Sequence, residues 1–178
     1  MDQQALTQRF SEVVQPHLAD ALALARWLTG SKHDAEDVVQ EACLKALAGL
    51  SGFRGGNARA WVLTVVRHTA YTWMRRHRPK ALLVVGDLAT LDALSGVATD
   101  HTQAGGDADL IRKADARSLQ SAIADLPLAF REVVVLRDIN DLTYKEIAEM
   151  LSIPIGTVMS RLSRARQTLA LVLTRDAR

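Results

Sequence analysis

The sequence predicts an all-α protein of two small helical domains, residues 1–78 and 108–178, joined by a flexible acidic linker over 79–107. On both sides of the linker, apolar residues recur at the three- and four-residue spacings of buried helix faces. Inside the linker this period is lost, and glycines and aspartates interrupt short apolar runs. One short helix, over 88–94, is expected there. The second domain also contains the pattern of a helix-turn-helix, which agrees with a purely helical fold.

The composition excludes several classes of protein. Hydrophobic residues make up 48% and charged residues 24% of the 178 residues, which is ordinary for a soluble globular chain. Cys43 is the only cysteine, so an internal disulfide framework and multi-cysteine metal motifs are excluded. No apolar run approaches the ~18 residues of a membrane span, and no basic-then-apolar leader opens the chain. We therefore expect a cytoplasmic protein without membrane insertion.

In the first domain, residues 5–28 are expected to form one long helix that ends at Gly30 with a left-handed cap. Ser31 and Asp34 then match the S-x-x-D start of a second helix, in which each side chain satisfies an unpaired backbone N–H group. The buried stripe of this second helix is expected to consist of Ala35, Val38, Val39, Ala42, Ala46, Leu47 and Leu50.

The opposite side of the second helix is acidic. Asp34, Asp37 and Glu41 are three and four residues apart, which places them on one side of a helix, and Gln40 accompanies them. A face of this kind is usually only solvated. In a domain that is otherwise basic, it also fits a protein surface that bears arginines.

The last helix of the first domain, expected over 59–77, lies in a segment that has seven cations and no acidic residue. The cations are Arg54, Arg59, Arg67, Arg75, Arg76, Arg78 and Lys80. The rings interleaved with them belong to His68, Tyr71, Trp73 and His77. Such a helix suits a nucleic-acid strand, because the charges follow the backbone and the rings offer stacking surfaces.

Simpler interpretations apply to some of these residues. For Trp61 and Trp73, packing in the core is favoured, whereas Tyr71 is equally expected to be exposed or buried. The arginines over 75–78 also suit the C-terminus of a helix, where the dipole favours cations. The seven cations together exceed what that position requires.

The second domain begins with a helix that ends near Leu126, where Pro127 interrupts the chain, and a further helix includes residues 133–137. Thr143 and Glu146 then form a capping box that opens a short helix. The residues of this short helix that are expected to face inward are Ile147, Ala148 and Leu151.

A tight turn over 152–154 joins this short helix to the final one, and two helices so connected form a helix-turn-helix. The final helix is expected to bury Val158, Leu162, Ala165 and Leu169. Its exposed side carries Thr157, Met159, Ser160, Arg161, Ser163, Arg164 and Arg166. These groups suit base edges and phosphates in a major groove. The alternative is a solvated face of a terminal helix, because helix-turn-helix geometry also occurs in proteins that never touch DNA.

No pattern typical of an enzyme is found. The five histidines are scattered without the spacing of metal ligands. The pair Gly55–Gly56 lacks the Lys and Ser/Thr of a phosphate-binding loop, and Cys43 beside the apolar stripe is best interpreted as a small buried hydrophobe. We therefore expect no catalytic residues, no metal site and no cofactor.

Several segments resemble bacterial RNA polymerase sigma factors, in the order in which that family carries them. In the first domain they are DAEDVVQE (34–41), FRG (53–55) and WVLTVVR (61–67). In the second domain they are LP (126–127), REVVVLR (131–137), LTYKEIAEML (142–151) and IGTVMSRLSRAR (155–166). With no other sigma regions, the chain is similar to the compact extracytoplasmic-function group, which has two conserved domains.

The resemblance implies a factor that binds core RNA polymerase and directs promoter-specific transcription initiation, in a stress or signal response under an anti-sigma factor. It implies docking on the polymerase by Asp34, Asp37, Gln40 and Glu41. It implies capture and melting of the −10 element, with one base flipped into a pocket near the 53–57 turn, by Phe53, Arg54, Asn57, Arg67, His68, Tyr71, Arg75 and Arg76. It implies reading of the −35 duplex by Thr157, Met159, Ser160, Arg161, Arg164 and Arg166.

The same resemblance implies that the acidic linker runs toward the active-site channel of the polymerase. The chain departs from the family at three positions, where His68, Thr72 and Met159 replace the usual Asn, Asp and Lys. Met159 removes one possible contact to a phosphate or a guanine, so these departures bear on promoter preference.

Two other functions fit parts of the sequence. A stand-alone helix-turn-helix regulator would bind duplex DNA without polymerase, but it leaves the acidic face and the basic helix unexplained. A protein-interaction module would use both basic patches to bind an acidic partner. Tight operator binding by the chain alone favours the first, and pull-downs independent of nucleic acid favour the second.

Overall fold

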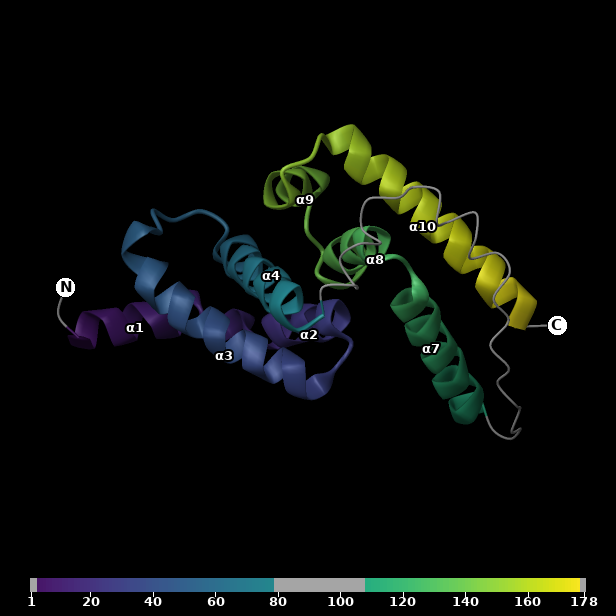
Figure 1. Ribbon diagram of the computed structural model, residues 1–178, viewed down its shortest axis with the longest axis horizontal. Helices are drawn as coiled ribbons and strands as arrows, with labels where there is room; N and C mark the ends of the chain where they lie inside the picture. Colours follow the sequence, from purple (N-terminus) through teal and green to yellow (C-terminus); the bar gives the residue numbers. More distant parts are fainter. Residues whose placement is uncertain (1–2, 79–107, 177–178) are drawn as a thin grey trace.

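The structure is a computed structural model that describes residues 3–78 and 108–176. Every regular element in these ranges is a helix, which confirms the all-α prediction (Figure 1). The predicted linker over 79–107, with its short helix over 88–94, lies outside the described residues. Helices α1 to α4 form one group and helices α7 to α10 form the other (Figure 1). No helix in the described ranges is long and apolar enough to cross a membrane.

The prediction of one uninterrupted helix over 5–28 is wrong, because the helix is interrupted around Pro16. Proline has no N–H group to donate, and its ring collides with the preceding turn of an α-helix. A short 3-10 turn therefore separates the first two helices. The three elements are α1 (Gln3–Val13), η1 (Gln15–His17) and α2 (Leu18–Thr29). Gly30 has a φ of 70°, and this confirms the left-handed cap at the end of α2.

The next helix, α3 (Lys32–Gly49), starts at Ser31 as predicted. The Ser31 hydroxyl accepts a hydrogen bond from the Asp34 N–H at 3.3 Å. In the predicted cap, the Asp34 carboxylate would in turn accept from the Ser31 N–H. It instead forms an ion pair in which it accepts from Arg78 Nη2 at 2.9 Å. A short 3-10 turn, η2 (Leu50–Gly52), and an irregular loop then lead to α4 (Ala58–His77).

The core of the N-terminal domain lies where α2, α3 and α4 pack together. Small residues of α3 let the three helices approach closely. The buried residues of α3 that face this core are Ala35, Val38, Ala42 and Ala46. The largest buried side chains around them are Leu24, Leu50, Leu63 and Val66. Val39 and Leu47 of the predicted stripe are half-buried at its edge.

The C-terminal domain starts with α7, and Pro127 then allows a change of direction. A π-helical turn extends the second helix, and the Asn140 N–H closes it by donating to the Val135 carbonyl at 2.9 Å. The elements are α7 (Ala108–Asp125), α8 (Leu128–Val134), η5 (Val135–Ile139), α9 (Tyr144–Leu151) and α10 (Ile155–Asp176).

The helix-turn-helix formed by α9 and α10 agrees with the sequence in detail. Both bonds of the capping box are present, since the Thr143 N–H donates to Glu146 at 2.8 Å and the Glu146 N–H donates to the Thr143 hydroxyl at 3.2 Å. Ser152 adopts a left-handed φ of 54° in the turn. The predicted buried stripe of α10 is confirmed at Val158, Leu162, Ala165 and Leu169. In α9, Ile147 and Leu151 are buried as predicted, but Ala148 is half-buried and Met150 fills the core instead.

The two domains contact each other. Helix α2 packs against α8 and the π-helical turn η5, and α4 contacts α9. In Figure 1, α8 lies beside α2 at the centre of the molecule, where the two groups of helices meet. Polar contacts across this boundary involve the predicted −10 surface.

Candidate nucleic-acid interface

The outer face of α10 is open to solvent. Met159 is 52% exposed, and Ser160 and Arg164 are exposed beside it. Thr157 and Arg161 are half-buried at the margins of this face. The one-sided pattern follows from the helical period, because Val158, Leu162 and Ala165 occupy the opposite side and pack in the core. Hydroxyl, thioether and guanidinium groups are thus presented together on one helix.

Arg166 differs from the other predicted residues of α10, because an acid of its own domain engages it. Its Nη2 donates to Asp138 Oδ1 at 2.5 Å and its Nε donates to Asp138 Oδ2 at 3.2 Å. The hydrogen bonds that Arg166 donates to the Asp138 carboxylate raise the pKa of Arg166 above its ordinary value. In this conformation the Arg166 guanidinium forms a bidentate ion pair with Asp138 and is not available to DNA through those two groups.

The loop over 53–57 is held by the helices around it. The Phe53 ring packs at 5.0 Å, centroid to centroid, against Trp61, and the Phe53 carbonyl accepts from Arg9 Nη2 at 2.5 Å. Gly55 and Gly56 have φ values of 95° and 97°, a region that favours glycine because it has no Cβ. Both glycines are exposed, as are Arg54 and Asn57, whose Oδ1 caps α4 by accepting from the Ala60 N–H at 3.0 Å.

The cations of α4 fall into two groups. Arg75 and Arg76 are exposed near the end of the helix, and His68 is exposed two turns earlier. Others are paired with acids from distant parts of the chain. Arg59 Nε contacts Asp20 at 2.7 Å, and Arg78 contacts Asp34 as described above. The segment is free of acids in sequence, but its surface is partly neutralised in the fold.

Trp61 and Trp73, for which core packing is predicted, pack against the core but are only half-buried. Trp61 is half-buried under Phe53, and Trp73 is half-buried and stacks on His77 at 4.4 Å between centroids. Thr72, at a position where the family usually has Asp, donates its hydroxyl hydrogen to the His68 carbonyl at 2.9 Å. These side chains therefore stabilise α4 itself.

Arg67 and Tyr71 form a cluster with Glu132 of the C-terminal domain. Arg67 Nε donates to Glu132 Oε1 at 2.6 Å, and the Tyr71 hydroxyl donates to Glu132 Oε2 at 3.0 Å. The Arg67 guanidinium also lies 4.6 Å from the centre of the Tyr71 ring. Glu132 is only 2% exposed, so its charge is desolvated between the two domains. The sequence contains no local signal for this contact, because the partners are 65 and 61 residues apart.

The electrostatics of this cluster favour the protonated forms of Arg67 and Tyr71. Burial raises the pKa of Tyr71 far above its ordinary value, and the Glu132 carboxylate raises it further, so the phenol stays protonated and donates. Burial alone would lower the pKa of Arg67, but the adjacent Glu132 carboxylate raises it above its ordinary value.

Two further bonds cross between the domains. The Asn57 amide donates to the Glu146 side chain, which links the 53–57 loop to α9. Arg131 Nη1 donates to the carbonyl of Trp27 in α2 at 3.1 Å. Burial lowers the pKa of Arg131, whose other amino group donates to the Leu126 carbonyl at 2.9 Å.

The outer face of α3 is polar with one apolar residue in its centre. Asp37 and Gln40 are exposed, whereas Glu41 contacts Lys45 at 2.7 Å. Leu44 is 69% exposed on the same face, four residues beyond Gln40, and sequence reasoning missed it. An apolar residue at helical spacing from a polar stripe was the available signal. Asp34 lies apart from this face, because its side chain is 17% exposed and bound to Arg78.

Two family models match the chain, in the order of its two domains. Residues 13–80 match sigma-70 region 2, and residues 116–169 match sigma-70 region 4. The chain is 31% identical over 143 residues to RNA polymerase sigma factor YlaC of Bacillus subtilis, a match that covers 80% of this chain and 79% of that protein. The chain belongs to the extracytoplasmic-function sigma factors.

Other relatives of this sigma factor agree. It is 31% identical over 170 residues to the ECF RNA polymerase sigma factor SigE of Mycolicibacterium smegmatis, covering 93% of this chain and 62% of that longer protein. Among solved structures it is similar to the sigma factor RpoE of Bartonella quintana in complex with the anti-sigma factor NepR. That match has a TM-score of 0.68 and 28% identity, and it covers 93% of this chain and 96% of the other.

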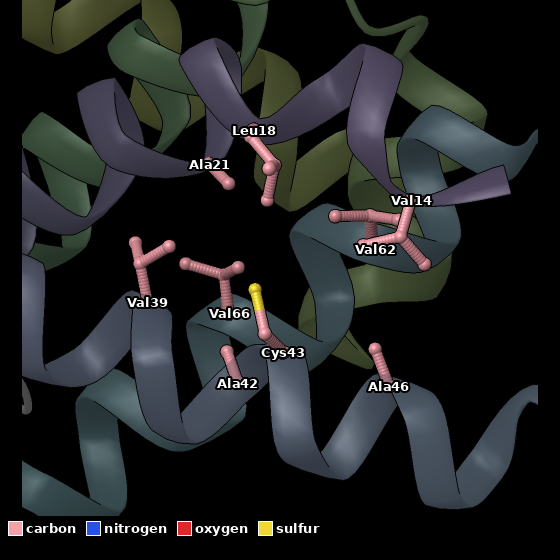
Figure 2. Close-up of a pocket in the computed structure, with 9 residues that line it drawn as sticks. All are labelled: Val14, Leu18, Ala21, Val39, Ala42, Cys43, Ala46, Val62 and Val66. Carbon is pink, nitrogen blue, oxygen red and sulfur yellow. The ribbon is translucent and has the colours of Figure 1, made fainter. Parts of the chain in front are cut away.

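Sigma factors are transcription initiation factors rather than enzymes, and Cys43 has no feature of a nucleophile. Its sulfur faces a cavity of about 10 Å³ that valines, alanines and Leu18 line (Figure 2). Burial raises the pKa of the Cys43 thiol, which disfavours the nucleophilic thiolate. Within the described parts of this sigma factor, no group of His, Cys, Asp and Glu residues is placed to hold a metal ion.

Proposed function

We propose that this sigma factor binds core RNA polymerase and directs promoter-specific transcription initiation. In this proposal α10 reads the −35 element as duplex, while the 53–57 loop and α4 hold the melted −10 element. The observation that carries the proposal is that one sigma-factor chain combines an exposed helix-turn-helix face in one domain with exposed cations along α4 and its loop in the other.

The exposed groups of α10 support its role in the major groove. Arg164 is a donor for phosphate oxygens or guanine, and Ser160 suits either kind of contact. Met159 replaces the cation that is usual in the family, and its thioether suits an apolar contact with a thymine methyl group. The turn at 152–154 and the buried stripe below fix the direction of this face.

The N-terminal surface supports a role with unpaired bases. Arg54, Arg75 and Arg76 are exposed cations along the loop and α4, and the Phe53 ring lies beside the two exposed glycines. Opening a duplex costs about 1.4 kcal/mol per base-pair step. Stacking on protein returns about 1–3 kcal/mol per base, so a few captured bases offset the opening of a few steps.

The outer face of α3 supports docking on the polymerase. Asp37, Gln40 and Glu41 would meet a basic protein surface, and Leu44 would bury its exposed apolar side chain at the centre of that contact. Asp34, predicted for the same surface, would act only after it leaves Arg78. When both domains are fixed on the polymerase, binding of one domain to DNA raises the effective concentration of DNA at the other. Two weak DNA contacts in one chain then give stronger binding together.

The solved relative suggests how the activity is controlled. That sigma factor was crystallised with an anti-sigma factor, and the match extends over both domains of this chain. We propose that an anti-sigma factor also holds this chain inactive, bound between its two domains. Because RNA polymerase works in the cytoplasm, the proposal also places the chain there.

The test is abortive transcription with purified core polymerase on candidate promoters from the source genome. Promoter-dependent product is expected only when the chain is added. The double variant Arg161→Ala/Arg164→Ala should reduce that product, while the exposed Glu149→Gln change in the same domain should not. No product from any candidate promoter would rule out the proposal. Tight binding to an operator duplex by the chain alone would instead favour a stand-alone regulator.

A further inference from the structure

Three residues predicted for the −10 element share an unexpected property, since each of them contacts the C-terminal domain. Arg67 and Tyr71 bind Glu132, and Asn57 binds Glu146. The remaining predicted residues of this surface either stay exposed or pack within their own domain. The contacts therefore fall on one end of the loop and the middle of α4.

Glu132 places its negative charge beside Arg67 and Tyr71, two of the residues predicted to bind the −10 strand. Both of its oxygens are used, because Oε1 accepts from Arg67 Nε and Oε2 accepts from Tyr71 and, at 3.5 Å, from Arg67 Nη2. A guanidinium over an aromatic ring is also the combination that binds a phosphate and stacks a base. One carboxylate thus satisfies the groups that single-stranded DNA would use.

We propose that, in the free sigma factor, the C-terminal domain covers the −10 surface through Glu132. Single-stranded promoter DNA and the Glu132 carboxylate then compete for Arg67 and Tyr71. This inference rests on the proposed function and adds a regulatory step to the same surface. Separation of α8 from α2 and α4 is required before the N-terminal domain can capture unpaired bases.

The burial of Glu132 makes the closed arrangement sensitive to its charge. Removing one partner of a buried ion pair is costly while the other stays buried. Glu132→Gln leaves Arg67 desolvated and without a counter-charge in the closed arrangement only, since Arg67 regains solvent once the domains separate. The substitution keeps the size of the side chain, so packing is little changed. The uncompensated charge of Arg67 then shifts the equilibrium toward the open arrangement.

The experiment compares Glu132→Gln with Glu149→Gln in the full-length chain. Both changes remove one negative charge from the same domain, but Glu149 is exposed on α9. Binding of a fluorescein-labelled poly(dT) of about 12 nucleotides is followed by fluorescence anisotropy. Glu132→Gln should bind it about tenfold more tightly than wild type, and Glu149→Gln within about twofold. Equal affinities for the two variants would overturn the inference.

Small-angle X-ray scattering provides a second readout. Glu132→Gln should have a larger radius of gyration than wild type, and poly(dT) should enlarge the wild-type chain. If Glu132→Gln does not fold by circular dichroism, Tyr71→Phe replaces it, because it removes one bond to Glu132 and keeps the ring. An unchanged radius in the folded variant, with and without poly(dT), would also overturn the inference.

Transcription with core polymerase separates this inference from the proposed function. Glu132→Gln should still support promoter-dependent transcription, because Glu132 itself touches no DNA in the proposal. If wild type transcribes but the two glutamine variants bind poly(dT) equally, the proposed function stands and the covering contact is refuted. If wild type does not transcribe, the proposed function fails, and the binding comparison still decides the inference.

Discussion

On α10, Met159, Ser160 and Arg164 are exposed, whereas on α4 the side chains of Arg67 and Tyr71 contact Glu132 of the other domain. Both helices are predicted to bind promoter DNA, and both bury their opposite sides in a domain core. The difference arises from what lies above each face. Nothing in the described residues covers the middle of α10, while α8 and α9 lie against α4 and its loop.

If α10 reads duplex and α4 captures unpaired bases, this difference indicates that the two surfaces need not be available at the same time. Duplex is present before a promoter opens, so a face that reads it can remain exposed. A surface for single strands is needed only after opening, and premature binding there would trap unrelated single-stranded nucleic acid.

The largest expected effect comes from removing cations of α10. Arg161→Ala combined with Arg164→Ala should weaken binding to a −35 duplex by about 100-fold, because each such contact contributes about 1–3 kcal/mol. The dependence of affinity on salt should flatten as well, because fewer counterions are released. Anisotropy titrations at several salt concentrations measure both quantities. Wild-type affinity and slope in the double variant would mean that α10 is not the reading helix.

A smaller effect is expected from releasing a cation that the fold already holds. Asp138→Asn removes the partner of Arg166 and should strengthen duplex binding by about threefold, since one more guanidinium becomes available. Binding of poly(dT) should not change, and this contrast sharpens the distinction between the two surfaces. Glu149→Gln is the control for net charge, and an equal gain in that variant would show that Arg166 is not involved.

Met159→Lys tests the residue that departs from the family. A cation at this exposed position should strengthen duplex binding by about twofold and steepen the salt dependence by about one phosphate contact. It should also reduce any preference for thymine over uracil in the −35 duplex, because uracil lacks the methyl group that Met159 would contact. An unchanged salt slope would place Met159 outside the DNA contact.

The smallest effect concerns the capping box below α10. The bond from the Thr143 N–H lowers the pKa of Glu146 in the folded state, so Glu146 stabilises the fold above the unfolded pKa. That contribution is lost as the pH falls through the folded pKa. Glu146→Gln keeps the capping geometry without titrating, so the difference in unfolding free energy from wild type should shrink between about pH 5 and pH 3. Urea titrations at each pH measure it, and a pH-independent difference would contradict the role of the charge.

The parts of the fold that depend on neighbouring residues were predictable from sequence. Thr143 and Glu146 are three residues apart, and Val158, Leu162 and Ala165 follow the helical period, so the helix-turn-helix needs no distant information. The same local reasoning identified α10 as a candidate DNA-binding helix and correctly expected Trp61 and Trp73 to pack against the protein.

The partners of the charged residues could not be predicted in that way. Arg59, Arg67 and Arg78 lie in a segment without acids, yet each meets an acid 39, 65 or 44 residues away. Which acid approaches is decided by how the helices pack, and no sequence period reports it. The roles assigned to the individual polymerase and DNA contacts remain predictions, and the variants above test those that concern DNA.

The interruption of the helix at Pro16 bears on the 53–57 loop, which is predicted to bind unpaired bases. Residues 5–28 form two helices rather than one, and Arg9 of α1 donates to the carbonyl of Phe53. This hydrogen bond from α1 stabilises the position of the 53–57 loop. The interruption at Pro16 therefore separates the helix that holds this loop through Arg9 from α2, which packs in the core of the domain.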